Sequence, residues 1–347
     1  MRIGHLDEPG KANSNYRRAI PLHALEQRGH VIVGPAAPEG DTPMRELVRC
    51  DLVHCFRREE RFQDLASLSR RGVAINFDND DDLSASDMLS GKSSLAALRL
   101  NRKRSAMFTK VAQLADLVTT PSQLLAEHYR SIGAERVTVI ENYLDRGVPH
   151  FGSRERHDGI VVGWIAGLEH APDAEPMGIA DIFARLLDAH PNLRVLTAGV
   201  HVPLRSERYE YIQNINHFDL LGTIARIDIG IAPLVDNAFN RARSNVKLKE
   251  YGAGGAAWLA SPVGPYRGLG SAEGGELVAD GDWYEAIDRL LRSGFARKKL
   301  ARRALKWAKG QTIDRHVQIW ESEFEAAIER AAARMASSRT AASAAKR

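Results

Sequence analysis

Short apolar runs alternate with longer amphipathic stretches along this chain, and the alternation occurs twice. The apolar runs have the length of buried strands, and the amphipathic stretches have the period of helices. Strands that alternate with helices in this way are typical of α/β folds with parallel sheets. The chain also has 347 residues, more than a single core usually contains. The sequence therefore predicts two α/β domains.

The point at which the alternation of apolar runs and amphipathic stretches resumes sets the predicted domain boundaries. The alternation resumes after a segment rich in Gly, Pro, Arg and His. We predict a first domain over residues 1–145, a linker over 146–158 and a second domain over 159–312. A C-terminal helix over 313–330 follows, and a basic tail rich in Ala and Ser over 331–347 is predicted to be disordered.

The basic balance of the chain comes from this tail. The formal net charge is +4, but the residues from Arg330 onward include several basic side chains and no acidic one. The rest of the chain is nearly neutral, whereas a nucleic-acid-binding fold carries its charge on the folded surface. The composition therefore predicts no nucleic-acid partner.

One basic amphipathic helix is predicted before the tail, over residues 297–309. It is either a solvated outer face over a packed Trp307, or a surface for a membrane or an acidic partner. No apolar run reaches the roughly 18–20 residues of a membrane span, and the first residues lack a secretory signal pattern. We expect a cytoplasmic protein, with peripheral membrane contact as an option. Cys50 and Cys55 have no metal-type spacing and are predicted to be reduced thiols.

Residues 227–267 carry the most chemical information. A buried strand leads to a polar loop, and a helix begins near Ser244 with Arg243 and Lys247 flanking its first turn. Ligands bind outside the carboxyl ends of strands in open α/β sheets, and helix N-termini favour phosphate. Arg243 and Lys247 are therefore predicted to contact a diphosphate. Glu250 follows Lys247 on the same helix face, where it can accept hydrogen bonds from ribose hydroxyls.

This segment resembles the donor-binding region of family-4-like GT-B glycosyltransferases (group 1 type). In that family a strand ending in Pro leads to a loop, a helix carrying Glu, a Gly and a strand ending in Ser. The matching residues are Asp228, Pro233, Glu250, Gly254 or Gly255, and Ser261. The string RSNVKLKEYGAGG is similar to a subset that reads K-S-N-x-K-x-x-E-Y-a-a-x-G. The resemblance implies donor contacts from Arg243, Ser244, Asn245, Lys247 and Glu250.

Four further segments match the family in the correct order, at residues 15–31, 115–129, 137–145 and 162–177. The last resembles the first turn of the donor domain and includes Gly167. The resemblance implies a GT-B fold, with two Rossmann-like domains facing a central cleft and the last helix crossing back to the first domain. It also implies transfer of a sugar, with retention, from a nucleoside-diphosphate-sugar donor to a hydroxyl acceptor. The acceptor stays open between a glycan, a lipid-linked molecule, a protein and a small molecule.

Two departures from the family pattern leave alternatives. Many relatives carry a second Glu, which contacts the donor sugar, where this chain has Ala242. Either the loop supplies another group, from Asp236, Asn240 or Asn245, or the sugar is held differently. The departure also favours a non-catalytic sugar-nucleotide-binding or structural protein as the runner-up. The Lys that often follows the first strand of the donor domain is absent, and Glu169 and His170 occupy that neighbourhood. His170 either donates to a phosphate or sugar oxygen, as a catalytic residue, or is a capping or exposed histidine. An oxidoreductase is disfavoured because no G-x-G-x-x-G follows either opening strand.

An acidic cluster in residues 77–87 has three interpretations. Its carboxylates, with Asp78 and Asp80 as catalytic candidates, bind acceptor hydroxyls or act as a general base. They hold a divalent cation, or they form a helix cap and a solvated loop. The metal is the least favoured, because GT-B enzymes commonly neutralise the leaving diphosphate with basic residues and helix dipoles. We therefore predict no metal ligand and no required cofactor.

The loop after the first strand is the remaining candidate. Gly10, Asn13, Ser14 and Arg17 are predicted to contact acceptor or donor phosphates. An ordinary strand-to-helix turn with Asn or Ser as the N-cap is the alternative.

Overall fold

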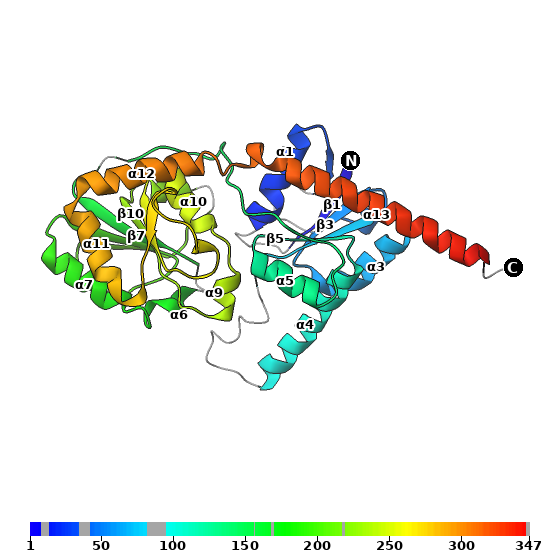
Figure 1. The fold of residues 1–347 in the computed structure, drawn as a ribbon, viewed down its shortest axis with the longest axis horizontal. Coiled ribbons are helices and arrows are strands. Elements are labelled where there is room, and N and C mark those ends of the chain that lie inside the picture. Colours follow the sequence, from blue (N-terminus) through cyan, green and yellow to red (C-terminus); the bar gives the residue numbers. More distant parts are fainter. Residues whose placement is uncertain are drawn as a thin grey trace. The chain divides into compact units, whose positions relative to one another are not determined.

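The computed structural model describes residues 1–7, 14–34, 42–81, 95–155, 157–167, 170–216 and 219–344. The chain divides into two compact units: unit 1 comprises Met1–Tyr143 and Ile313–Arg347, and unit 2 comprises Leu144–Thr312. Each unit has its own sheet, shown in colours from blue to green for unit 1 and from green to yellow for unit 2 (Figure 1). The chain returns to unit 1 only after unit 2 is complete.

In the described residues of unit 1, a six-stranded parallel sheet has the order β2-β1-β3-β4-β5-β6. The strands are β1 (Arg2–Leu6), β2 (Val31–Val33), β3 (Leu52–Phe56), β4 (Ala74–Asp78), β5 (Leu117–Thr120) and β6 (Val137–Val139). The strands β3, β4 and β5 are buried along their whole length, as expected where helices cover both faces of a parallel sheet. The register places Asp78 beside Phe56 of β3 and Thr119 of β5. The acidic segment therefore begins at the carboxyl edge of the sheet.

The helices of unit 1 come from both of its sequence segments. They are α1 (Ile20–Gln27), α2 (Met44–Leu47), α3 (Phe62–Arg70), α4 (Leu95–Leu114), α5 (Gln123–Ser131) and α13 (Val317–Ala344). A π-helical turn, Asn15–Ala19, runs directly into α1. The Oγ of Ser122 caps α5 by accepting a hydrogen bond from the Leu125 amide at 3.4 Å.

The C-terminal helix α13 packs on the sheet of unit 1. Its buried apolar positions follow helical spacing: Trp320, Phe324, Ala327 and Ala331. Arg330 donates to the Asp116 carbonyl at 2.8 Å, and Arg334 forms an ion pair with the Asp116 carboxylate. The sequence predicts disorder over 331–347, but the helix continues to Ala344. The reason is the Ala-rich composition, which favours a helix. The packed first turns of α13 offset the free-energy cost of helix nucleation, so the helix extends into the tail.

Unit 2 contains, within its described residues, a second six-stranded parallel sheet with the order β12-β11-β10-β7-β8-β9. The strands are β7 (Ile160–Ile165), β8 (Leu193–Ala198), β9 (Tyr209–Ile212), β10 (Ile229–Ala232), β11 (Ala257–Ala260) and β12 (Gly275–Leu277). The helices are α6 (Ala171–Ala174), α7 (Ile179–Ala189), α8 (Leu220–Ile224), α9 (Ala238–Ala242), α10 (Val246–Ala253), α11 (Trp283–Arg292) and α12 (Gly294–Ala308). The core of the unit is apolar and includes Trp164, Phe183 and Trp283.

The sequence does not predict β9 and α9 of unit 2. The residues of β9 are all half-buried, so they form no continuous apolar run. The five-residue α9 lies in a segment that reads as a polar loop, and it is too short to show a helical period. Asn237 starts α9, since its Oδ1 accepts a hydrogen bond from the Asn240 amide at 2.8 Å.

The longest described helices are α4, with 20 residues, and α13, with 28 residues. Charged side chains interrupt the apolar positions of both helices. In the part of the chain that the structure describes, no helix is both long and apolar enough to cross a membrane.

Candidate active site

The strand order of unit 2 indicates where a ligand would bind. The chain runs outward from β7 through β8 to β9, then returns to β10 on the other side of β7 and continues to β11 and β12. The order therefore reverses between β7 and β10, which are paired neighbours. Open α/β sheets bind ligands outside the carboxyl ends of the strands at such a reversal. The candidate site consists of the segment after β7 and the segment after β10, which leads through α9 to α10.

Two residues of the sequence motif hold this edge of the sheet together. The buried Tyr251 hydroxyl accepts a hydrogen bond from the Ile165 amide at 3.0 Å and donates one to the Ile231 carbonyl at 2.8 Å. Burial raises the pKa of Tyr251, so the hydroxyl stays protonated. The Oγ of Ser261 accepts a hydrogen bond from the Leu234 amide at 2.9 Å. These contacts fix the backbone that leaves β7 and β10.

Asp173 joins the two segments of the candidate site. Its buried carboxylate accepts hydrogen bonds through Oδ1 from the Val235 amide at 3.1 Å and from Asn240 Nδ2 at 2.8 Å. Its Oδ2 lies 3.0 Å from His170 Nδ1. Our sequence predictions do not select Asp173, whereas Asn240 is one of the loop residues that they consider in place of the missing second Glu. The signal that could have found Asp173 is its position three residues after His170 at the start of a helix.

Arg243 meets His170 at this junction, with 3.2 Å between the guanidinium NH2 group and His170 Nε2. A guanidinium only donates hydrogen bonds, so Nε2 accepts and the ring proton lies on Nδ1, facing Asp173. His170 directly precedes α6, but its side chain makes no capping hydrogen bond to that helix. The Arg243 guanidinium also lies over the Phe239 ring, 5.1 Å from its centroid. The structure thus brings together a histidine of fixed tautomer and a cation that come from opposite sides of the strand reversal.

Lys247 and Glu250 form an ion pair on α10, with 2.6 Å between Nζ and Oε2. The Glu250 side chain is 3% exposed and that of Lys247 is 23% exposed, so the cation is the more accessible partner. Ser244 and Asn245 are half-buried and lie directly before α10, with Asn245 at the N-cap position. Gly167 is exposed after β7. The predicted donor residues are therefore distributed over the two segments that meet at the strand reversal.

Several of these charges act on one buried hydroxyl, that of Tyr266. Tyr266 lies in the short turn after β11 and is 4% exposed. Burial raises its pKa, the positive charge of Arg243 opposes this, and the negative charges of Glu250 and Asp173 add to it. The proton affinity of Tyr266 therefore responds to charges from three different segments of the unit. Our sequence predictions do not select Tyr266, which is separated from α10 by a whole strand.

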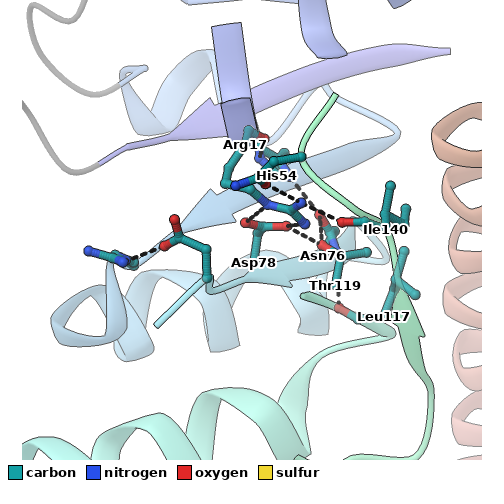
Figure 2. A network of polar contacts seen from close by, with 10 residues as sticks. Arg17, His54, Asn76, Asp78, Leu117, Thr119 and Ile140 are labelled. Carbon is teal, nitrogen blue, oxygen red and sulfur yellow. Dashed lines mark hydrogen bonds and ion pairs between the residues drawn. The ribbon is translucent and has the colours of Figure 1, made fainter. Parts of the chain in front are cut away.

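Arg17 and Asp78, which the sequence places on the acceptor side, lie in the core of unit 1 (Figure 2). Arg17 donates from Nε and NH2 to the two carboxylate oxygens of Asp78, at 3.0 and 2.7 Å. Its NH1 donates to the Ile140 carbonyl at 2.5 Å and to Asn142 Oδ1 at 3.0 Å. The Thr119 hydroxyl donates to Asp78 at 2.5 Å.

The burial of this pair corrects two predictions. Both side chains have 0% exposure, so Arg17 does not reach a phosphate and Asp78 is not available to an acceptor hydroxyl. The sequence gives no sign of this burial, because a fully buried Arg or Asp is rare and depends on a partner that is distant in sequence.

The same network extends to β3 and β5 (Figure 2). His54 donates from Nε2 to the Arg17 carbonyl at 2.9 Å, and its Nδ1 lies 2.6 Å from Asn76 Oδ1. Asn76 Nδ2 donates to the Thr119 hydroxyl at 3.1 Å and to the Leu117 carbonyl at 3.3 Å. Burial lowers the pKa of His54. This polar network joins three central strands to the turn before α1.

Asp80 is the carboxylate of the acidic cluster with a perturbed proton affinity. It is 4% exposed and forms an ion pair with Arg57, which also pairs with Asp81. Burial raises the pKa of Asp80 from 3.8 to about 6, while Arg57 opposes the shift and Asp81 adds to it. Arg57 itself has a φ of 52° at the end of β3, a left-handed conformation that is rare for a non-Gly residue. A carboxylate of this proton affinity can exchange a proton near neutral pH.

Several predicted residues lie outside the described part of the chain. Gly10 and Asn13 are among them, as are Glu169 and Asp82. Among the residues that are described, no group of three His, Cys, Asp or Glu side chains is arranged to hold a metal ion.

Solved structures share this fold. Sucrose-phosphate synthase from Thermosynechococcus elongatus is 15% identical, with a TM-score of 0.65 over 93% of this chain and 96% of that chain. HepE from Anabaena, solved with UDP-glucose, is 15% identical, with a TM-score of 0.63 over 93% and 99%. An α-glucosyltransferase solved with UDP and DNA is 11% identical, with a TM-score of 0.65 over 94% and 99%. No protein-family model and no curated protein matches the sequence.

These likenesses cover nearly the whole chain and establish its fold. The chain has the α/β architecture of the GT-B glycosyltransferases, with one Rossmann-like sheet in each unit. The fold predicted from the order of the sequence motifs is confirmed.

Proposed function

We propose that this chain transfers a sugar from a nucleoside diphosphate sugar to a hydroxyl acceptor, with retention of the anomeric configuration. The observation that supports it best is the contact of Arg243 with His170 at the strand reversal of unit 2. Ligands of open α/β sheets bind at this position. Its cations, histidine and buried carboxylate are the groups that a diphosphate, a sugar and a ribose require.

The cations suit the charge that develops during transfer. Departure of the nucleoside diphosphate builds negative charge on the phosphate oxygens and positive charge on the sugar carbon. Arg243 and Lys247, together with the N-terminus of α10, would stabilise the phosphate oxygens. Since Nε2 of His170 accepts its hydrogen bond from Arg243, a diphosphate that binds Arg243 would free Nε2 to accept a hydrogen bond from a hydroxyl of the donor sugar.

Glu250 would fix the position of the donor. A carboxylate accepts hydrogen bonds from both hydroxyls of a ribose, and its place on α10 is set by burial and by Lys247. We take uridine nucleotides as the first donors to test, because HepE and the α-glucosyltransferase were solved with UDP-glucose and UDP.

Asp80 is our candidate for the acceptor side. Its raised pKa is what a general base needs near neutral pH. The other candidate, Asp78, is fully buried in unit 1. As the carboxylate it would accept the proton of the attacking hydroxyl.

A second function, sugar-nucleotide binding without turnover, has one observation in its favour. Ala242 is buried at the end of α9, where many members of the resembled family carry a second Glu. In that case the donor would bind at the same residues, but no sugar would be transferred.

A thermal-shift screen with UDP-, GDP-, CDP- and TDP-sugars tests the donor site. A ligand at about 100 times its dissociation constant adds roughly 2.7 kcal/mol to the free energy of unfolding, which raises the melting temperature visibly. We expect one nucleotide family to stabilise the protein and Glu250→Ala to remove the response. The matched control is Glu276→Ala, which removes the ion pair between Glu276 of β12 and Arg289 of α11. Glu276→Ala should melt like the parent with the ligand bound.

Turnover separates the two functions. Release of UDP, and the anomeric configuration of the product by NMR, would be followed with the stabilising donor. Stabilisation without release of UDP to any hydroxyl acceptor or to water would favour the binding protein. A protein that responds to no nucleotide sugar would contradict both.

A further inference from the structure

The outer face of α12 carries a row of cations that the proposed function does not use. We call this row the basic face. It consists of Lys298, Lys299, Arg302, Arg303 and Lys306, with Lys309 directly after the helix, and all six side chains are exposed.

The spacing of these residues makes them one surface. They recur at intervals of three and four, so successive side chains lie on the same side of the helix. The opposite side is buried through Leu300, Ala301, Ala304 and Ala308, and α12 packs there against α10 and β11. The helix is therefore fixed by its apolar side, and the basic face points away from the unit.

The described residues place no carboxylate in an ion pair with the basic face. The sequence of α12, GFARKKLARRALKWA, contains no acidic residue. Within the described part of the chain, none of the six cations forms an ion pair with a carboxylate, whereas other exposed basic residues of the unit, such as Arg289 and Arg292, do. An array of unpaired cations attracts an extended negative surface.

Phe295 adds an apolar group to the same surface. It precedes Lys298 by three residues, so it lies in line with the basic face, and it is 75% exposed. A large exposed aromatic side chain beside cations is typical of helices that lie in the interface of a membrane, where the ring enters the headgroup region.

We propose that the basic face and Phe295 dock unit 2 onto an anionic phospholipid surface. From Lys298 to Lys309 the basic face extends over about 17 Å, at about 1.5 Å per residue, so its cations lie along one line that a planar surface can meet. Each basic residue near an anionic membrane strengthens binding about fivefold, and six acting together suffice for peripheral association. Phe295 favours a lipid surface over a nucleic acid, because it supplies an apolar anchor to which a phosphate backbone offers no counterpart.

The test is sedimentation of the full chain with vesicles of phosphatidylcholine, alone or mixed with phosphatidylglycerol. We expect binding only to the mixed vesicles, with a strong decrease at high salt. The double variant Lys298→Glu and Arg302→Glu should bind at least about 100-fold more weakly, because it changes the charge of the face by four. Phe295→Ser should weaken binding about tenfold, and the remaining binding should be more sensitive to salt.

The matched control is the double variant Arg49→Glu and Arg70→Glu, which makes the same charge change on exposed residues of unit 1. It should bind the mixed vesicles like the parent. Equal losses in the two double variants would overturn the proposal, because the overall charge would then be responsible. Failure of the parent to bind mixed vesicles, or binding to a nucleic acid duplex in place of the vesicles, would also overturn it.

The outcome is independent of the proposed function. The α12 variants keep every donor-site side chain, so a correctly folded variant retains its melting temperature and its response to nucleotide sugars. A variant that loses membrane binding but keeps both supports the basic face as the docking surface.

Discussion

Arg17 and Asp78 form a two-bond ion pair in which neither side chain has any exposed surface. The pair joins the π-helical turn before α1 to the last residue of β4, across 61 residues of sequence. Two charges in a core offset each other only while both are present. The pair therefore fixes the turn before α1 against the carboxyl end of β4.

Replacing Arg17 by Met should destabilise the protein by about 3–5 kcal/mol, because Asp78 is left buried without its cation. The measurement is the free energy of unfolding in urea. Arg136→Met is the matched control, since Arg136 pairs with Glu323 but is 49% exposed. Its loss should stay below about 1 kcal/mol. Losses of the same size in the two variants would contradict the structural role of the Arg17–Asp78 pair.

Arg243→Ala should lower kcat by about 10²–10³-fold, because it removes a donor from the developing charge of the leaving diphosphate. Folding should be little affected, since Arg243 is half-exposed. Arg243→Lys keeps the charge but loses the planar fork and should recover only part of the rate. Steady-state kinetics with the stabilising donor measures both variants. A full recovery by Lys would show that the contact with His170 is not needed.

The raised pKa of Asp80 predicts a pH dependence. A general base must be deprotonated, so kcat/KM should rise with pH through about 6 and then level off. Asp80→Asn should lose most of the activity and this inflection, whereas Asp64→Asn, a partly exposed carboxylate of α3, should keep both. An inflection that persists in Asp80→Asn would assign it to another group.

Asp80 also affects stability, with the opposite trend. Its pKa is higher in the folded protein than in the unfolded chain. Its contribution to stability is therefore present below about pH 3.8 and is lost as the pH rises through about 6. The melting temperature of Asp80→Asn should depend less on pH in this range than that of the parent.

Tyr251→Phe should destabilise the protein by about 1–3 kcal/mol, because the Ile165 amide and the Ile231 carbonyl lose a buried partner. Tyr284→Phe removes the hydroxyl of a half-buried tyrosine on α11 and should change stability far less. Thermal unfolding without ligand compares the two. A negligible effect of Tyr251→Phe would mean that water replaces its hydroxyl.

Most of the fold could be predicted from the sequence because its strands are continuous apolar runs between helices. The run Ile160–Ile165 is β7, and the run in residues 257–260 is β11. The strand β9 could not be found in this way, since half-burial leaves it without an apolar run. The prediction of a disordered tail was wrong because an Ala- and Ser-rich composition is compatible with either a solvated coil or a helix. Contacts of Arg330 and Arg334 with Asp116 hold the first part of the tail in the helix.

The candidate site could be predicted only where its residues share one stretch of sequence. Arg243, Lys247 and Glu250 lie on a single turn and helix, so their spacing carries information. Asp173 and Tyr266 join them only through the tertiary fold. Conversely, Arg17 reads as a surface residue in sequence, and only its partners in the folded core reveal its position.

The division of unit 1 between two stretches of sequence has a consequence for synthesis. The ribosome completes residues 1–143 first, but Trp320 and Phe324 of α13, which are buried in unit 1, are made only after unit 2. Unit 2 has all its residues before unit 1 does, although unit 1 begins first. The nascent chain must therefore carry an open apolar surface on unit 1 through the whole translation of unit 2, and a premature stop before residue 313 would leave that surface uncovered permanently.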